Sequence, residues 1–280
     1  MQPPPDLTDR DALVRFRARA ARMAEPALFL HEAAAAEVQE RLALVNRSFT
    51  SPAVVTGLPE AWQWVPGARL VADTEVLDLE IQAHDLVIHA LALHWANDPV
   101  GQLVQARRAL RPDGLMIAVL FGGQTLAELR AVLAEAEVAV TGGLSPRIAP
   151  MAEIRDAGAL LQRAGFALPV ADSVSQAVSY ATSLDLMRDL RAMGEVNALA
   201  DRHRRPLRRD VIAAADRLYQ REFADGDRIR ATFEMIFLTG WAPSSDQPKP
   251  LRPGSATTRL ADALGTEETP ADDPARPNRV

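Results

Sequence analysis

Cysteine is absent from the 280 residues of this sequence. The chain therefore has no disulfide, no thiolate nucleophile and no cysteine-ligated zinc or iron–sulfur site. Lysine occurs once, at Lys249, and aromatic residues make up only 5% of the sequence. The net charge is −6, and an acidic chain lacks the basic surface that generic nucleic-acid binding needs. We therefore expect no nucleic-acid partner.

Long apolar runs are also missing. The longest, residues 86–93, has eight residues and includes His89, whereas a membrane-spanning helix needs about 20. The first five residues contain three prolines, where a signal peptide would have its apolar segment. We expect a cytoplasmic protein with no membrane span. A chain of this length can form one large domain, or a domain with an appendage.

Helix-forming residues dominate the start of the chain. Residues 1–47 are rich in Ala, Arg, Glu and Leu, and Pro26 separates two predicted helices within them. Residues 48–242 are predicted to form an α/β domain with a helical insertion at about 184–223. Residues 243–280 contain seven prolines, which predicts a disordered tail.

The middle of the chain carries the pattern of a parallel sheet. The apolar run 85–89 is typical of a buried strand, and residues 98–110 are typical of a helix that starts at Asp98 and Pro99. A turn at 111–114 leads to a second buried strand at 115–120. Strand, helix and strand in this order form a βαβ unit. The remaining predicted strands are 53–56, 69–72, 174–180 and 231–241, and the remaining predicted helices are 125–140, 153–164, 184–194 and 207–223.

Four segments resemble one family. They read HDLVIHALALHWAND at 84–98, RRALRPDG at 107–114, FGGQTLAELR at 121–130 and GGLSPR at 142–147. The first two are similar to the fourth- and fifth-strand region of class I S-adenosylmethionine-dependent methyltransferases, in the type 11 branch that includes the malonyl-carrier-protein methyltransferase of biotin synthesis. The last two resemble the sub-branch of the respiratory complex I assembly factor. The resemblance implies a Rossmann-like methyltransferase sheet with helical N-terminal and C-terminal additions.

The resemblance also implies a site for S-adenosylmethionine, and the sequence departs from the family there. The family holds the cofactor on a turn with three glycines after the first strand, because the backbone must approach the ligand without Cβ atoms. The corresponding residues 55–61 read VTGLPEA, so that Gly57 is the only glycine left. Pro59 also removes a backbone donor. This turn predicts weak cofactor binding or none.

The spacing after this turn is short as well. Gly57 and Asp85 are 28 positions apart, whereas a single βαβ unit takes about 30 residues or more. We therefore predict a sheet shortened by one β/α unit, with the second strand missing. Asp73 is then matched to the acidic residue near the third strand, which contacts adenine in the family. The other cofactor contacts that the resemblance implies are Ala90, Leu91, His94 and Trp95.

His94 and Trp95 are also candidate catalytic residues, because they follow a strand at the carboxyl edge, where open α/β sheets place their sites. The alternative is a capped loop with Trp95 packed in the core. Arg147 is a third candidate that could bind a carboxylate or an acidic group of a partner, or belong to a plain surface loop. No metal site is predicted, since His89 and His94 face different sides of a strand end. Five arginines within residues 202–209 could dock an acidic partner or form a solvated loop.

Three functions remain open at this point. The first is methyl transfer from S-adenosylmethionine, to a protein subunit or to the carboxyl group of a small molecule or carrier protein. The second is a non-catalytic scaffold that has lost the cofactor and binds a complex I subunit during assembly. The third is another reaction on the same scaffold, such as the arginine hydroxylation with which the family's complex I assembly factor is associated. The sequence leaves open whether the chain is an enzyme.

Overall fold

The computed structural model describes residues 6–247, together with residues 258, 262, 265 and 266. Contacts divide the chain into a unit of residues 1–244 and a second unit of residues 245–280. The tail predicted at 243–280 lies almost entirely outside the described residues. In the part that is described, no helix is long and apolar enough to cross a membrane.

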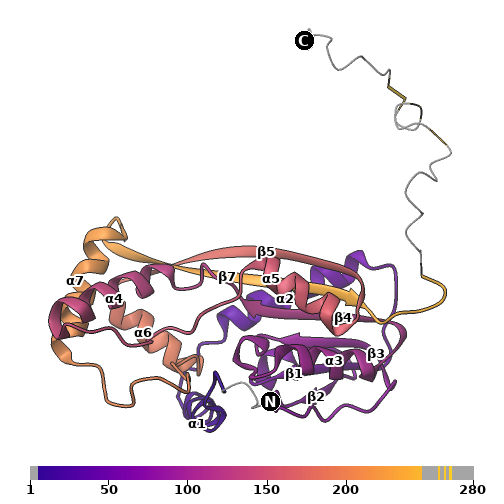
Figure 1. Ribbon diagram of the computed structural model, residues 1–280, viewed down its shortest axis with the longest axis horizontal. Helices are drawn as coiled ribbons and strands as arrows, with labels where there is room; N and C mark the ends of the chain where they lie inside the picture. The colour runs from indigo at the N-terminus through magenta and orange to yellow at the C-terminus, as the bar shows by residue number, and fades with distance from the viewer. Residues whose placement is uncertain (1–5, 248–257, 259–261, 263–264, 267–280) are drawn as a thin grey trace, which may run out of the picture. The chain divides into compact units, whose positions relative to one another are not determined.

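The first unit is a mixed α/β fold (Figure 1). The helices are α1 (Arg10–Ala20), α2 (Phe29–Leu44), α3 (Pro99–Ala109), α4 (Ala127–Thr141), α5 (Ile154–Ala164), α6 (Ser183–Ala192) and α7 (Arg209–Glu222), with single 3-10 turns at η1 (Pro59–Trp62) and η2 (Leu93–Trp95). The strands are β1 (Pro52–Thr56), β2 (Arg69–Val71), β3 (His84–Ala90), β4 (Leu110–Phe121), β5 (Ala167–Tyr180), β6 (Ala224–Asp225) and β7 (Arg228–Trp241).

The strands form one sheet in the order β2-β1-β3-β4-β7-β5, with β6 paired to β7. The pairs from β2 to β4 are parallel, whereas β7 runs antiparallel to both β4 and β5. The predicted βαβ unit is confirmed as β3, α3 and β4. The carboxyl ends of β1, β2, β3 and β4 consequently lie at the same edge of the sheet.

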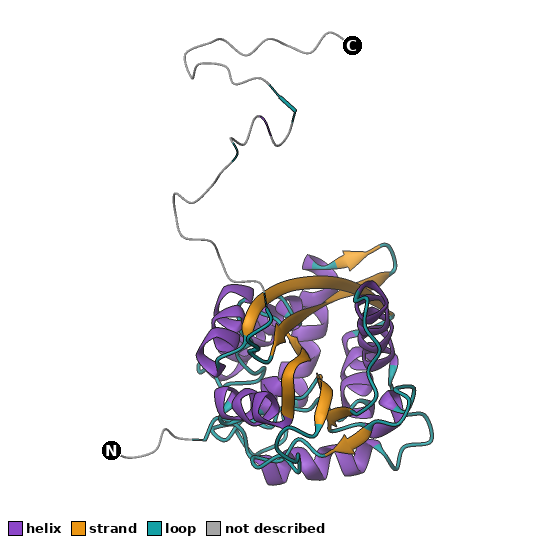
Figure 2. Cartoon of the chain, turned by 90° about the vertical axis from the view of Figure 1, so that its right-hand side faces the viewer, coloured by secondary structure: helices purple, strands orange, loops and turns teal. Residues whose placement is uncertain are grey.

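Helices cover both faces of the sheet (Figure 2). Successive residues of a strand point to opposite faces, so that Val54 and Ile88 pack in one apolar cluster while Val55 and Val87 pack in the other. The first cluster includes residues of α2, α4 and α7, and the second includes residues of α3 and α5. These two faces bury every residue of β1. The continuous apolar strands of the sequence follow from this double burial.

Local signals fix several helix ends, and those at Asp98 and Gly165 lie where the sequence predicts them. Asp9 caps α1 by accepting a hydrogen bond from the backbone N–H of Ala12 (2.9 Å). Asp98 caps α3 in the same way through Gly101 (2.8 Å). At the C-terminal end of α5, Gly165 takes the left-handed conformation (φ 81°) that favours glycine. These caps are encoded within a few residues, which is why the boundaries were predictable.

The interval after β1 is as short as predicted, but the identity of the missing strand was wrong. Residues 57–83 are all described, and they contain only η1 and the three-residue β2. Because β2 pairs directly with β1, it lies where the second strand of such sheets lies. The third strand is therefore the one without a counterpart. Asp73 thus follows the second strand of such a sheet and not the third.

Two further predictions fell short of the observed strands. The residues 111–114, predicted as a turn, are part of β4, where Asp113 has a positive φ (61°) and the register with β3 shifts. The strand predicted at 174–180 begins at Ala167, because β7 pairs with it from Ala167 to Tyr180, with one register shift between Ala167 and Val170. Pairing with a distant strand outweighs the local signal of Pro169.

Candidate functional site

The carboxyl edge carries the residues that the sequence singled out. Gly57 directly follows β1, and Ala90 is the last residue of β3. Leu91 then takes a positive φ (46°), and its N–H donates to the carbonyl of Val119 on β4 (2.9 Å). A non-glycine residue in this conformation is unfavourable, and the bend directs the chain into η2 with His94 and Trp95.

His94 and Trp95 meet at one carboxylate that the sequence analysis missed. The indole N–H of Trp95 donates to Oε2 of Glu195 (2.7 Å), and Nε2 of His94 lies 3.3 Å from the same oxygen. The His94 ring also packs on Phe121, with ring centroids 4.9 Å apart. Both partners of the ion pair are largely buried, with side-chain exposures of 3% for His94 and 8% for Glu195.

The Glu195 carboxyl is ionised in this setting. Burial by itself raises its pKa, but the hydrogen bond and charge of His94, the charge of Arg17 and the Trp95 N–H together lower the pKa below its ordinary value. A buried, charged carboxylate is a strong electrostatic feature, because few water molecules screen it.

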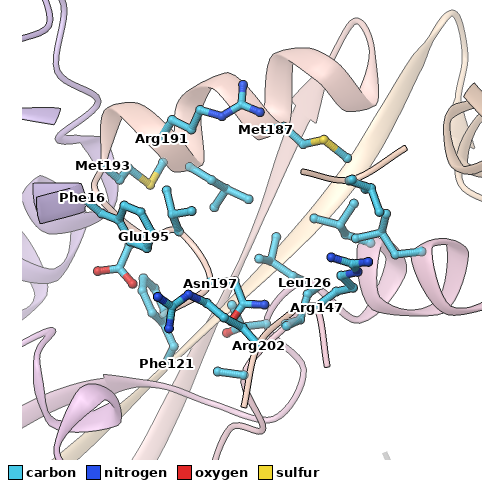
Figure 3. A pocket seen from close by; sticks show the side chains of 18 of the residues that line it. Phe16, Phe121, Leu126, Arg147, Met187, Arg191, Met193, Glu195, Asn197 and Arg202 are labelled. Carbon is cyan, nitrogen blue, oxygen red and sulfur yellow. The ribbon is translucent and has the colours of Figure 1, made fainter. Parts of the chain in front are cut away.

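Glu195 lies in the wall of a cavity of about 510 Å³ (Figure 3). Most of the wall is apolar, as in small-molecule pockets, and its charged side chains are Glu195 and the arginines Arg19, Arg147, Arg191, Arg202 and Arg204. Residues of α4, α6, β7 and the segment 195–207 contribute to it. The apolar part of the wall includes Leu30, Phe121, Leu126, Leu129, Leu133, Ile148, Ala149, Met151, Met187, Leu190, Met193 and Phe233. We call this cavity with Trp95, Glu195 and Arg147 the cavity side of the site.

Arg147 lies in the cavity wall but is bound within the chain. Its Nε lies 3.3 Å from Oε2 of Glu137, and its Nη2 bonds the other oxygen. Ser145 donates to the same carboxylate through its N–H and its hydroxyl, both at 3.0 Å. Burial raises the pKa of Glu137, and these donors together lower it below its usual value. The carboxylate that Arg147 binds in this structure is thus its own chain's Glu137.

Asp73 is the centre of a second cluster, beside β1 and β2. It accepts from Nη1 of Arg17 (2.8 Å) and lies 3.2 Å from Nη2 of Arg10. All three side chains are largely buried, with exposures of 7% for Asp73, 10% for Arg17 and 18% for Arg10. Both arginines come from α1, which therefore covers the ends of β1 and β2. We call Gly57, Asp73, Arg10 and Arg17 the cofactor side of the site.

S-adenosylmethionine does not fit this cofactor side. A Cβ atom placed on Gly57 would lie 2.1 Å from Nη1 and 2.2 Å from Cζ of Arg17. The space that the glycine leaves open, into which a cofactor would enter, is therefore filled by the Arg17 guanidinium. The carboxylate of Asp73 is occupied by the same group. Of the residues matched to the cofactor site, Ala90 and Leu91 are fully buried and have no exposed surface for a ligand.

Two other buried histidines have internal partners. Nε2 of His89 donates to Oε1 of Gln102 (2.7 Å), and Nδ1 of His31 accepts from the indole N–H of Trp62 (3.1 Å). Burial lowers the pKa of each histidine to about 4. Across the described residues, no group of three or more His, Asp or Glu side chains is placed to hold a metal ion.

The two residues that sequence reasoning missed are Arg17 and Glu195. Arg17 is one of several arginines in a helix-forming stretch, and nothing in its spacing separates it from Arg15 or Arg19. Glu195 follows Gly194, which has φ 79° and ends the turn after α6. A conformationally special glycine followed by an acid was the one local signal available.

The comparisons with known proteins agree with this fold. The family model described as a methyltransferase domain matches residues 35–118. The chain is 39% identical over 199 residues to the mitochondrial arginine hydroxylase NDUFAF5 of Danio rerio, covering 71% of this chain and 62% of that protein. It is 32% identical over 203 residues to the malonyl-[acyl-carrier protein] O-methyltransferase of Halorhodospira halophila, covering 72% and 67%. Among solved structures, the YcgJ protein of Bacillus subtilis is similar over 76% of this chain and all of its own, with 11% identity and a TM-score of 0.47.

These relatives define the class of the protein as an α/β fold with a methyltransferase domain. The chain belongs to the class I S-adenosylmethionine-dependent methyltransferase family, in the branch that contains both groups of relatives. It spans between 45% and 62% of the length of the arginine hydroxylases of Danio rerio, Dictyostelium discoideum and Rattus norvegicus.

Proposed function

We propose that this chain recognises a protein subunit during assembly of respiratory complex I, through a cationic side chain that enters the cavity. The curated relatives with 37% to 39% identity are arginine hydroxylases, and the sequence resembles the complex I assembly factor. The single observation that carries the proposal is the buried Glu195 carboxylate, the one acidic side chain among the described residues of a wall that also holds five arginines. The proposal keeps the cytoplasmic location expected from the sequence.

An arginine side chain matches the part of this cavity that lies beside Glu195, away from the arginines of the wall. Its three methylene groups can be buried against apolar walls, such as those formed by Leu126, Leu190 and Met193, while its guanidinium meets a carboxylate. Trp95 and His94 hold Glu195 from one side, which leaves the carboxylate oriented before a ligand arrives. Such preorganisation favours binding because less freedom is lost in the complex.

Transfer of a methyl group to a carboxylate is less well supported. The cofactor for that reaction does not fit beside Gly57 while Arg17 is there. The recognition role requires neither a free cofactor side nor a carboxylate pocket.

Ligand binding tests the recognition step directly. We expect N-acetyl-arginine amide to quench or shift the fluorescence of Trp95, which lines the cavity and donates to Glu195. N-acetyl-citrulline amide has nearly the same shape but no charge, and should bind at least about tenfold more weakly. Equal binding of the two amides would refute a role for the Glu195 charge.

Genetic complementation tests the biological role. We expect deletion of the gene to lower the amount of assembled complex I on native gels, and the wild-type gene to restore it. Glu195→Gln should fail to restore assembly, because it removes the charge and keeps the size. Glu40→Gln makes the same change at an exposed position of α2 and should restore it fully. Normal complex I in the deletion strain would contradict the proposal.

A further inference from the structure

The N-terminal helix places an arginine where the family fold binds its cofactor. Arg17 reaches from α1 between two glycines. Its stem passes Gly194, where an added Cβ would lie 3.0 Å from Cγ of Arg17 and 3.1 Å from its Cα. Its guanidinium lies on Gly57, 2.1 Å from the position of an added Cβ. A Cβ atom at Gly57 would require the guanidinium to move, and one at Gly194 would press on the Arg17 stem.

The guanidinium also binds the acid that a ribose would need. Asp73 follows the strand next to β1, the position from which an acidic residue binds ribose hydroxyls in related open sheets. In this chain Nη1 of Arg17 donates to Oδ1 of Asp73 at 2.8 Å. A single side chain thus fills the space beside the turn and uses the carboxylate behind it.

We propose that Arg17 is an intramolecular occupant of a latent ribonucleoside site, and that it excludes S-adenosylmethionine by competing for Gly57 and Asp73. The site opens when the Arg17 side chain leaves, and Asp73 then accepts from the two ribose hydroxyls. This inference does not depend on a link to complex I.

Other contacts of α1 keep this occupant in place. Oδ2 of Asp9 binds Arg202 at 2.8 Å, and the backbone N–H of Asp9 donates to the carbonyl of Ala198 at 2.7 Å. Arg10 binds Asp73 as well as the carbonyl of Trp95 (3.2 Å). Departure of the whole helix would break all of these bonds, so the wild-type chain stays closed to nucleosides.

Removal of the Arg17 side chain is the first test. Titration calorimetry of the full-length chain with S-adenosylmethionine, S-adenosylhomocysteine and adenosine should give no binding to wild type up to about millimolar ligand. Arg17→Ala should bind at least one of them about tenfold more tightly or better. Micromolar binding by wild type, or no gain in Arg17→Ala, would overturn the proposal.

Arg10→Ala is the matched control. Arg10 comes from the same helix and pairs with the same Asp73, but it is not among the groups nearest to Gly57. We expect this variant to lose stability without gaining affinity. An equal gain in both variants would mean that general loosening opens the site, which contradicts direct competition.

A ligand without ribose hydroxyls tests the role of Asp73. 2′,3′-Dideoxyadenosine should not bind Arg17→Ala, and binding as tight as that of adenosine would overturn this role.

Gly57→Ala gives a test without any ligand. The new methyl group displaces the guanidinium and weakens its bond to Asp73, so that the Tm of the wild-type chain should fall. In the Arg17→Ala background the same methyl group enters empty space and should leave the Tm unchanged. Equal shifts in the two backgrounds would show that Arg17 does not lie on Gly57, and would overturn the proposal even if a variant bound a nucleoside.

Discussion

The cofactor side and the cavity side lie at the same sheet edge, yet they are filled in opposite ways. On the cofactor side two arginines of α1 surround one carboxylate, and the space beside Gly57 is taken. On the cavity side a space of about 510 Å³ is present, and Glu195 has a histidine and an indole as its partners. One part of this edge is filled by the chain's own arginines, while the other borders an open pocket.

This difference shows that a fold can keep one half of its site and use the other for stability. The helix that covers the cofactor side supplies charged groups that are themselves largely buried. Buried ion pairs require all partners to be present, since a lone buried charge is strongly destabilising. Substitutions on the cofactor side should therefore mainly lower the stability of the fold, whereas substitutions on the cavity side should mainly weaken ligand binding.

Loss of Asp73 should have the largest effect. Asp73→Ala leaves Arg10 and Arg17 buried without their carboxylate and should lower the free energy of unfolding by about 3–5 kcal/mol. Glu137→Ala on the cavity side leaves only Arg147, which borders an open cavity, and should cost about 2 kcal/mol. Urea denaturation of both variants measures the two values. A larger loss for Glu137→Ala would reverse the comparison.

The buried histidines should make stability depend on pH. Burial lowers the pKa of His31 and of His89 from 6.5 to about 4. The unfolded chain therefore binds protons that the folded chain does not, and stability falls as the pH drops from about 6.5 towards 4. Each histidine contributes a loss of about 3 kcal/mol over that window.

His31→Gln separates this effect from that of the carboxylates. Glutamine can still accept from Trp62 but does not titrate, so the slope of unfolding free energy against pH between 6.5 and 5 should fall to about half. The carboxyl groups with lowered pKa values, such as Glu195 and Glu137, act at lower pH because their unfolded pKa values lie near 4.3. An unchanged slope in His31→Gln would show that His31 is not buried in its neutral form.

The sequence predicted the boundaries of helices and strands correctly where the determining residues lie within a few positions of the boundary. The apolar run of β3, the capped start of α3 at Asp98 and the end of α5 at Gly165 were all placed within one or two residues. Each depends on neighbours a few positions away. The start of β5 was missed because it depends on pairing with β7, more than 60 residues later in the chain.

Prediction of the site residues also succeeded only where the signal is local. The sequence placed Gly57, His94 and Trp95 at the carboxyl edge, because strand ends can be read from local patterns. It did not identify Arg17 or Glu195, since Arg17 is 56 positions from Asp73 and Glu195 is 100 positions from Trp95. A catalytic role for His94, Trp95 or Arg147 stays a prediction.

Filling the cavity should separate function from stability. Ala149 is 7% exposed and lines the cavity, so Ala149→Leu places apolar atoms in apolar space and should raise the free energy of unfolding by up to about 1 kcal/mol. The same change should abolish rescue of complex I assembly in the deletion strain. Ala159→Leu adds an equal side chain at an exposed position of α5 and should rescue fully. Full rescue by Ala149→Leu would mean that the cavity has no role.

The smallest effect is expected for exposed ion pairs of Arg69 on β2, the strand that leads to the cofactor side. Arg69 of β2 forms ion pairs with two carboxylates, Asp78 at 2.7 Å and Glu80 at 3.0 Å. Their side chains are 86% and 75% exposed, so water and salt screen the attraction. Arg69→Ala should leave the midpoint of thermal unfolding unchanged in buffer and in 0.5 M salt (about a 4 Å screening length). If its midpoint fell as far as that of Arg17→Ala, the number of ion pairs on this side, and not their burial, would determine its stability.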